Sequence, residues 1–363
     1  MPTVITFVSP AQRLSRAFNH VGQNSMKICS SSGSVLCGHQ QAQKKLLAGA
    51  DFLTLQLGFD AAKHIEAQAW MRAQARVKPM LACVMKLTAR RAAALQGVPG
   101  VVVTESMHEL LGREQQVSRT HADAKSLERL ALQIVGLQLM GYAGVHVSGI
   151  HTLDALLSLE RAIIEQRDGV GSLADWSERW HASWQMPGAP RVFFAPAADT
   201  WEMGQSVVAA TRWERLRYSL LDAAHEQLFS RTGWLSCAFG WSVTRPIWKI
   251  GVAASALHTI ERTIKRPLVG CDTCGSCRLQ DTLYVCPETC PKGLANGPCG
   301  GTRLNRCEFG DRECVHSVKY RIAKSTDQLS VLAGTLIPPV EAGERHRSSW
   351  PEWFYPDDAA SRR

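Results

Sequence analysis

The feature that most constrains this chain is a cysteine cluster near its C-terminal end. Of its 12 cysteines, eight lie within one short segment, namely Cys271, Cys274, Cys277, Cys286, Cys290, Cys299, Cys307 and Cys314. The first three are spaced C-x₂-C-x₂-C, so successive thiolates can turn toward one centre without strain, and iron–sulfur ferredoxins use the same run. Cys286 and Cys290 are each followed by proline, as is the remote cysteine of that pattern. Eight thiolates match two four-ligand centres.

The intervals of the cluster are rich in glycine and proline, which lets backbone amides turn toward sulfur atoms. A loop-rich segment of this kind depends on metal for its folding. Two alternatives stay open: two [4Fe–4S] clusters would make the segment an electron conduit, and two tetrathiolate zinc sites would make it structural. The C-x₂-C-x₂-C run favours iron–sulfur. Tyr284, His316 and Arg278 lie nearby, and we expect them to pack or face solvent rather than bind metal.

Composition narrows the class of protein. The chain has 363 residues, of which 45% are hydrophobic and 20% charged, which excludes a disordered tail and a membrane-spanning protein and allows two or three domains. Its first arginine follows the N-terminal apolar run, the wrong order for a secretory signal. We therefore expect a cytoplasmic protein, in which clustered cysteines hold metal rather than form disulfides. The scattered cysteines are predicted to be buried apolar residues: Cys29, Cys37, Cys83 and Cys237.

The first half alternates short apolar runs with segments of helical composition. The runs are MKICSS from Met26, Ala50–Gln56, Pro79–Val84, Gly100–Val103 and Ala143–Gly149. This alternation predicts an α/β fold with βαβ units and a parallel sheet, and the near-continuous apolar runs indicate strands buried on both faces. Only four or five strands fit before about residue 165, whereas a closed (β/α)₈ barrel needs eight.

The segment after Asp168 differs in composition. It is rich in Trp, Gly and Pro, which predicts an irregular connector, and a helix is expected over Arg212–Phe229, with a second from about Ile247 to Lys265. The second helix is basic and lies close to Trp234, Trp241 and Trp248. Such a stretch can lie on a membrane surface; we expect instead that these tryptophans pack between domains.

The net charge of +9 suits a phosphate-bearing, polyanionic or acidic protein partner. Nucleic-acid binding through zinc ribbons is not favoured, because the basic residues are spread along the chain and the cluster lacks C-x₂-C pairs separated by a ribbon-like interval. The predicted domains are residues 1–167 (partial barrel), 168–266 (Trp-rich connector and helices), 267–330 (cysteine-rich metal domain) and 331–363 (tail).

The cysteine segment closely resembles the C-terminal domain associated with methylenetetrahydrofolate reductases, which occurs in the small subunit of the acetogen-type enzyme and fused behind the catalytic barrel in some bacterial proteins. The matching residues are Cys271-x-x-Cys274-Gly275-x-Cys277, Cys286-Pro287, Cys290-Pro291-Lys292, Asn296-Gly297-Pro298-Cys299-Gly300-Gly301, Cys307-Glu308 and Cys314-Val315. The tail, with Pro338-Pro339 and SSWPEWFYPDD from Ser348, is similar to the end of the fused form.

The first half is similar to the second half of the reductase barrel. AGADFLTLQLGFD resembles strand six, KPMLACVMKLT strand seven, GYAGVHVSGIHTLDA strand eight and MKICSSSG strand five. The resemblance implies a partial TIM-type barrel of strands five to eight, with Gln56 at the position that contacts folate. It also places Lys44 and Lys45 at the basic pair that holds flavin phosphates. A polar group at a sheet rim is the alternative for Gln56, and a solvated helix face for the lysines.

The family's acid on strand one and its Asp on strand four have no counterpart here, and its His-bearing loop after strand five is not recognisable. The resemblance therefore implies part of a flavin-dependent (FAD or FMN) system that reduces 5,10-methylenetetrahydrofolate to 5-methyltetrahydrofolate, inactive alone. A complementary reductase barrel or a second copy would be its partner, because an incomplete barrel leaves sheet edges uncovered. The alternative is a non-catalytic zinc-binding or electron-transfer module on a vestigial barrel.

Overall fold

The computed structural model describes residues 5–8, 42–96, 98, 101–185, 209–230, 233–249, 251–297, 299, 302, 305–338, 340, 343 and 345–354. The chain divides into two compact units, unit 1 over Met1–Gln205 and unit 2 over Ser206–Arg363. This division falls inside the segment expected to be the connector. Each unit is described by itself.

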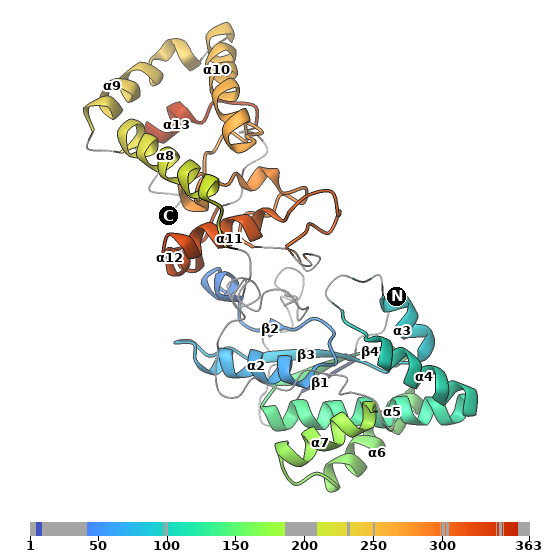
Figure 1. Cartoon of the computed structure of the whole chain (residues 1–363). Helices are drawn as coiled ribbons and strands as arrows, with labels where there is room; N and C mark the ends of the chain where they lie inside the picture. Colours follow the sequence, from blue (N-terminus) through green and yellow to red (C-terminus); the bar gives the residue numbers. More distant parts are fainter. Residues whose placement is uncertain are drawn as a thin grey trace. The chain divides into compact units, whose positions relative to one another are not determined.

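Unit 1 is built on a four-stranded sheet with the order β1-β4-β3-β2 (Figure 1). Its strands are β1 (Ile5–Val8), β2 (Leu53–Thr54), β3 (Met80–Met85) and β4 (Gly144–Ser148). The last three are parallel, with Thr54 beside Leu81 and Cys83 beside His146. The predicted parallel sheet is thus confirmed as three strands of a mixed α/β unit, a coarser description than a partial barrel.

Two features of the sheet differ from the sequence prediction. β1 was not expected, and it pairs antiparallel with β4, with Ile5 opposite Val147. The run at Gly100–Val103 was expected to be a strand, but its described residues, 101–103, form none and lead instead into a helix that starts after Thr104. The run at Met26 lies outside the described residues.

Helices follow the parallel strands in unit 1. They are α2 (Ala61–Arg72), α3 (Ala89–Leu95), α4 (Glu105–Val117), α5 (Arg119–Met140), α6 (Leu153–Asp168) and α7 (Leu173–Trp184), and residues 42–47 are also helical. Each of α2 to α7 begins after an Asp, Ser or Thr whose side chain accepts a hydrogen bond from a first-turn amide. Such caps satisfy amides that the helix itself leaves unpaired.

The segment from residue 168 was expected to be irregular, and for Leu173–Trp184 this was wrong. Trp176, Trp180 and Trp184 recur every fourth residue, so they share one face of α7, and each is only 1% exposed. The Trp176 indole donates to the Leu132 carbonyl at 2.6 Å, which ties α7 to α5. These three tryptophans, whose abundance predicts a connector, form the buried face of a helix.

Unit 2 is helical, with a loop-rich middle. Its helices are α8 (Arg212–Phe229), α9 (Trp234–Val243), η2 (Pro246–Lys249), α10 (Gly251–Val269), η3 (Gln280–Thr282), η4 (Pro287–Thr289), α11 (Val315–Ser325), α12 (Leu329–Gly334) and α13 (Trp350–Phe354). The predicted helix at Arg212–Phe229 is confirmed. The expected helix from Ile247 to Lys265 is two elements, η2 and α10, because Gly251 at φ +62° interrupts the run.

Unit 2 has two small apolar clusters. One joins Leu283 and Val285 to Ile322 of α11, and the other joins Val243 and Leu257 to Trp350. Trp248 packs against the second cluster. The other two tryptophans of this stretch do not pack within unit 2, because Trp234 is 78% exposed and Trp241 66%, and their expected packing between domains stays a prediction. Among the described residues, no helix combines the length and the apolar character that a membrane span needs.

Candidate metal centre

The eight clustered cysteines divide between two hollows in the order in which they occur along the chain. The first cysteine pocket is lined by Cys271, Cys274, Cys277 and Cys286. The second cysteine pocket is lined by Cys290, Cys299, Cys307 and Cys314. None of the eight forms a disulfide. Each pocket is therefore lined by four of the cysteines, the number that one tetrathiolate centre uses.

The first cysteine pocket lies where α10 ends and irregular backbone begins. Gly270 (φ +65°) and Gly275 (φ +83°) adopt left-handed conformations that let the chain reverse around the first three thiols. The Thr273 amide donates to the Cys271 sulfur over 3.4 Å, and the Cys274 thiol donates to the Ser276 carbonyl at 3.2 Å. The expected approach of backbone amides to sulfur is confirmed at Cys271.

A cation that the sequence did not single out lies against the first pocket. The Lys265 ammonium on α10 lies 3.4 Å from the Cys277 sulfur and 2.5 Å from the Glu261 carboxylate. Burial alone would lower the pKa of Lys265, but the thiolate of Cys277 and the carboxylate of Glu261 outweigh it and raise that pKa to about 12. A positive charge is thereby held beside the thiols, where it offsets the charge of a thiolate ring.

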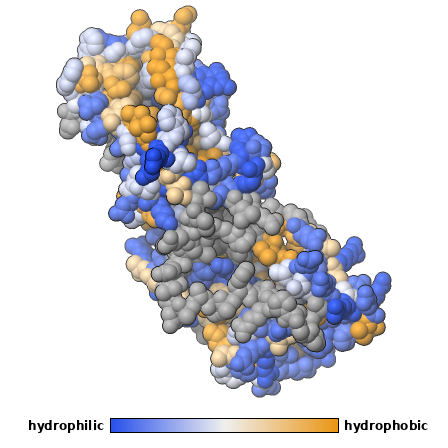
Figure 2. Space-filling model, in the orientation of Figure 1, coloured by the Kyte–Doolittle hydropathy of each residue, from blue (hydrophilic) through white to orange (hydrophobic). Residues whose placement is uncertain are grey.

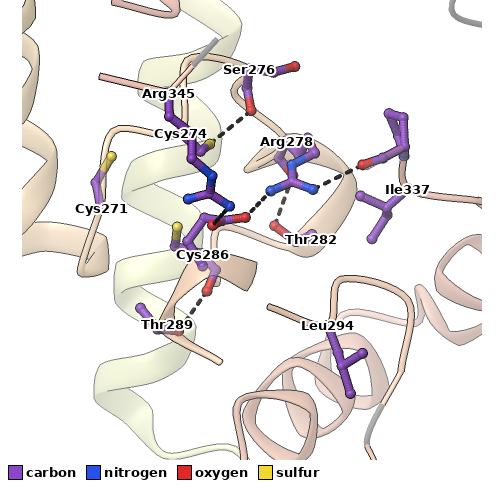
Figure 3. A network of polar contacts seen from close by, with 12 residues as sticks. Cys271, Cys274, Ser276, Arg278, Thr282, Cys286, Thr289, Leu294, Ile337 and Arg345 are labelled. Carbon is purple, nitrogen blue, oxygen red and sulfur yellow. Dashed lines mark hydrogen bonds and ion pairs between the residues drawn. The ribbon is translucent and has the colours of Figure 1, made fainter. Parts of the chain in front are cut away.

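The wall of the first pocket is held by a buried ion-pair network (Figure 3). Arg278 donates to the Glu288 carboxylate at 2.5 Å and to the Pro338 carbonyl at 2.9 Å. Arg345 donates to the other oxygen of Glu288 at 2.9 Å. This network joins η4 to two points of the tail. Arg278 lines the first pocket, and its guanidinium is paired with Glu288, as expected for a packing role.

Burial controls the protonation of the first-pocket thiols. It raises the pKa of Cys271 and of Cys274, and it raises the pKa of Cys286 to about 12. These thiols are therefore protonated at neutral pH when nothing is bound. A metal that takes them as thiolates must displace their protons.

The second cysteine pocket is shaped by a tight turn. The Cys307 amide donates to the Arg312 carbonyl at 3.0 Å, and the Cys314 amide donates to the Asn305 carbonyl at 2.7 Å. Cys314 then directly precedes α11. The Cys299 thiol lies 3.4 Å from the Glu308 carboxylate, which is itself paired with Lys292.

The two other residues that the sequence placed near the cluster have packing partners. The buried Tyr284 hydroxyl donates to Asp222 at 2.9 Å. The buried His316 ring lies beside the second pocket, with its Nε2 atom 3.0 Å from the Leu294 carbonyl. Across the described residues, no three His, Cys, Asp or Glu side chains are close enough together to hold a single metal ion. Each pocket gathers four thiols without closing a coordination sphere around one atom.

The residues predicted to bind folate and flavin lie in unit 1. Gln56 is half-buried and directly follows β2, at the carboxyl end of that parallel strand. Lys44 is 3% exposed, so the solvated-face alternative does not hold for it. Burial lowers the pKa of the half-buried Lys45 to about 8. The structure therefore places the pair in a partly desolvated setting, and their expected role stays a prediction.

The scattered cysteines depart from the prediction where they can be checked. Cys83 is half-buried and Cys237 is exposed, so neither is a core residue, and Cys29 and Cys37 lie outside the described residues. On β3 and β4 burial alternates, and the half-buried positions include Cys83 and its neighbour His146. Burial lowers the pKa of His146. The expectation that the strands are buried on both faces is therefore wrong for β4.

Comparison with known families places the cysteine pockets inside one matched segment. Residues 252–342 match the family model described as methylene-tetrahydrofolate reductase C terminal. The match begins in α10 and contains all eight clustered cysteines. No curated protein matches the chain.

Proposed function

We propose that this chain, whose residues 252–342 form a methylene-tetrahydrofolate reductase C-terminal domain, is a methylenetetrahydrofolate reductase-like subunit. It would take part in the flavin-dependent reduction of 5,10-methylenetetrahydrofolate to 5-methyltetrahydrofolate, a step that consumes two electrons and two protons. The observation that carries the proposal is the division of the eight matched cysteines into two four-thiol pockets. A domain with two such centres is suited to relay electrons to a flavin.

The donor sets fit two [4Fe–4S] clusters, with two zinc ions as the alternative. Four sulfurs around one zinc ion lie about 4 Å from one another, because each is about 2.3 Å from the metal. The C-x₂-C-x₂-C spacing of the first-pocket cysteines supports the larger centre, since iron–sulfur proteins use the same run. When bound, an iron–sulfur cluster supplies one-electron transfer. Lys265 and the Thr273 amide would then offset the thiolate charge in the first pocket.

Unit 1 would supply part of a flavin and folate site. β2, β3 and β4 are parallel neighbours in chain order, which supports their assignment as barrel strands six, seven and eight. Gln56 follows β2 at the strand end where barrel enzymes place their substrates, and there it would contact folate. Lys44 and Lys45 would hold flavin phosphates, and a partner barrel would provide the acidic residues that this chain lacks.

One observation favours the second candidate, a non-catalytic zinc-binding or electron-transfer module. β1 runs antiparallel along β4, at the edge where a closed barrel would continue with a parallel strand. A sheet that covers its own edge in this way is suited to be a self-contained scaffold rather than half of a shared barrel.

Metal content tests the proposal. Protein purified without oxygen should hold about eight iron and about eight sulfide per chain, and absorbance near about 400 nm should bleach with dithionite. Cys286→Ser in the first pocket and Cys314→Ser in the second should each remove about half of the iron. Cys237→Ser, outside both pockets, is the matched control and should remove none. About two zinc ions and no iron would support the structural alternative, and neither metal would refute both.

Activity with a partner separates the two candidates. If the chain is a reductase subunit, adding a reductase-type barrel protein should give methylenetetrahydrofolate reduction that neither protein shows alone. Gln56→Ala should then raise KM for the folate substrate. A loaded chain that neither binds such a barrel nor supports reduction would establish the electron-transfer or scaffold function instead.

A further inference from the structure

The exposed side of α9 is a continuous apolar stripe. Trp234, Cys237, Ala238 and Trp241 lie at positions i, i+3, i+4 and i+7, so they share one face of the helix, and all four are exposed. The opposite face is also apolar where it packs, with Val243 buried. A helix that is apolar on both faces is normally covered on both. The exposed fractions of Trp234 and Trp241, 78% and 66%, show that the described residues of unit 2 leave the outer stripe uncovered.

A second exposed stripe runs along α10. Val252, Ala256, Ile260 and Ile264 recur every fourth residue, and Val252 is 87% exposed. The packed side of α10 is formed by other residues, including Leu257, so this stripe is not the core face of an ordinary amphipathic helix. In Figure 2, hydrophobic surface gathers over α9 and α10. We call the exposed stripes of α9 and α10 together the tryptophan face.

The charge around the tryptophan face has one sign. Residues 233–260 contain no Asp or Glu, whereas Arg245 follows the α9 stripe. The Arg245 guanidinium lies 3.6 Å from the centre of the Trp241 ring, so a cation is held at the end of the apolar stripe. Arg262 and Arg266 are exposed on α10 next to its apolar stripe. The face therefore joins apolar side chains to cations without intervening acids.

We infer that the tryptophan face binds the surface of a membrane that contains anionic phospholipids. Tryptophan rings favour the boundary between headgroups and acyl chains, aliphatic side chains enter the outer acyl region, and arginines attract anionic headgroups. The stripes of α9 and α10 supply all three kinds of side chain. This inference does not depend on the proposed reductase function.

A matched residue elsewhere in unit 2 makes the inference testable. Trp213 on α8 is 68% exposed, as much as Trp241, but α8 also carries Glu214, Asp222 and Glu226. An exposed apolar stripe is thus also present on α8, where Leu216 and Leu220 accompany Trp213, but on α8 it lies among acidic residues. Trp213→Ser is therefore the control for Trp234→Ser combined with Trp241→Ser.

The experiment is co-sedimentation of the full chain with vesicles of phosphatidylcholine, with and without phosphatidylglycerol. Binding is expected only with phosphatidylglycerol, and it should weaken as salt rises. The Trp234→Ser and Trp241→Ser double variant should lose at least about tenfold in binding. Arg245→Gln should lose about fivefold, and Trp213→Ser should bind like wild type. Circular dichroism spectra that match wild type would show that the variants fold.

A second measurement does not rely on sedimentation. Lipids brominated high on the acyl chain should quench tryptophan fluorescence in the wild type and in Trp213→Ser, but not in the double variant. No binding to anionic vesicles at low salt would overturn the inference, as would equal loss in Trp213→Ser and the double variant. Concentration-dependent dimerisation that the double variant abolishes, without vesicle binding, would assign the face to a second copy of the chain instead.

Discussion

Replacing Gly136 with alanine tests the packing of unit 1. The change has two effects on the free energy of unfolding, and they have opposite signs. Gly136 lies inside α5, where alanine is favoured over glycine by about 1 kcal/mol of helix propensity. A Cβ at this position, however, would lie 1.9 Å from the Trp176 Cε2 atom and 2.5 Å from its Nε1 atom. Trp176 is 1% exposed, so its ring has no free space into which to move.

The magnitudes decide which effect wins. Overpacking of a filled core costs about 1–3 kcal/mol. Displacement of the ring also strains or breaks the hydrogen bond from the Trp176 indole to the Leu132 carbonyl, and a buried donor left unpaired costs about 1–3 kcal/mol. After the propensity gain of about 1 kcal/mol, Gly136→Ala should lower the free energy of unfolding of unit 1 by about 1–5 kcal/mol.

Gly112 is the matched control. It lies inside α4, and a Cβ there would meet nothing within 4 Å, so Gly112→Ala should raise the free energy of unfolding by up to about 1 kcal/mol. Urea unfolding of the full chain, followed by tryptophan fluorescence and circular dichroism, measures both variants. If Gly136→Ala unfolded at the same or a higher urea concentration than wild type, the close packing of α5 on α7 would be wrong.

Three further predictions concern charged groups. Arg129→Met should lower the free energy of unfolding by about 3–5 kcal/mol, because it leaves the buried Glu114 carboxylate without its ion pair. Urea unfolding measures this loss. Recovery of stability in the double variant Glu114→Gln/Arg129→Met would show that the unpaired charge was the cause. The folded chain releases the Lys45 proton near pH 8, whereas the unfolded chain keeps it to about pH 10.5. The free energy of unfolding should therefore rise between pH 8 and pH 10.5. Thermal melts over this pH range measure the rise, which Lys45→Met should flatten. Glu261→Gln should speed tryptic cleavage in the tail by more than about tenfold, because Glu261 accepts from the Ser349 amide at 2.8 Å; an unchanged rate would mean that this contact does not hold the tail.

The sequence predicted the elements whose signal is local. The runs Pro79–Val84 and Ala143–Gly149 differ from β3 and β4 by one residue at each end, because buried parallel strands are continuous apolar runs. The helix at Arg212–Phe229 has leucine spacing and a capping box at Thr211 that mark its start. β1 could not be predicted in this way, because β4, the strand with which it pairs, is far along the chain.

The candidate site was predictable in its ligands but not in its arrangement. The C-x₂-C-x₂-C run assigns three thiols to one centre, but spacing alone does not say whether Cys286 or Cys290 is the fourth, and only the fold places Cys286 in the first pocket. The contact between Lys265 and Cys277 could not be predicted from the cysteine spacing either. The spacing of Glu261 and Lys265 indicates a helical ion pair, and nothing local indicates the sulfur beside it.

The contacts of the tail make it part of the cysteine domain rather than an appendage. The Asn296 side chain exchanges two hydrogen bonds with the Ile337 backbone, at 2.7 and 2.8 Å. Glu261 on α10 accepts from the Ser348 hydroxyl at 2.6 Å and from the Ser349 amide. Burial alone would raise the pKa of the Glu261 carboxylate, but the neighbouring Lys265 outweighs burial and lowers that pKa. The same Lys265 contacts the first cysteine pocket. The matched segment ends at residue 342, yet Ser349, beyond it, helps to position the Lys265 ammonium beside Cys277. The structural unit around the first pocket therefore extends to the start of α13.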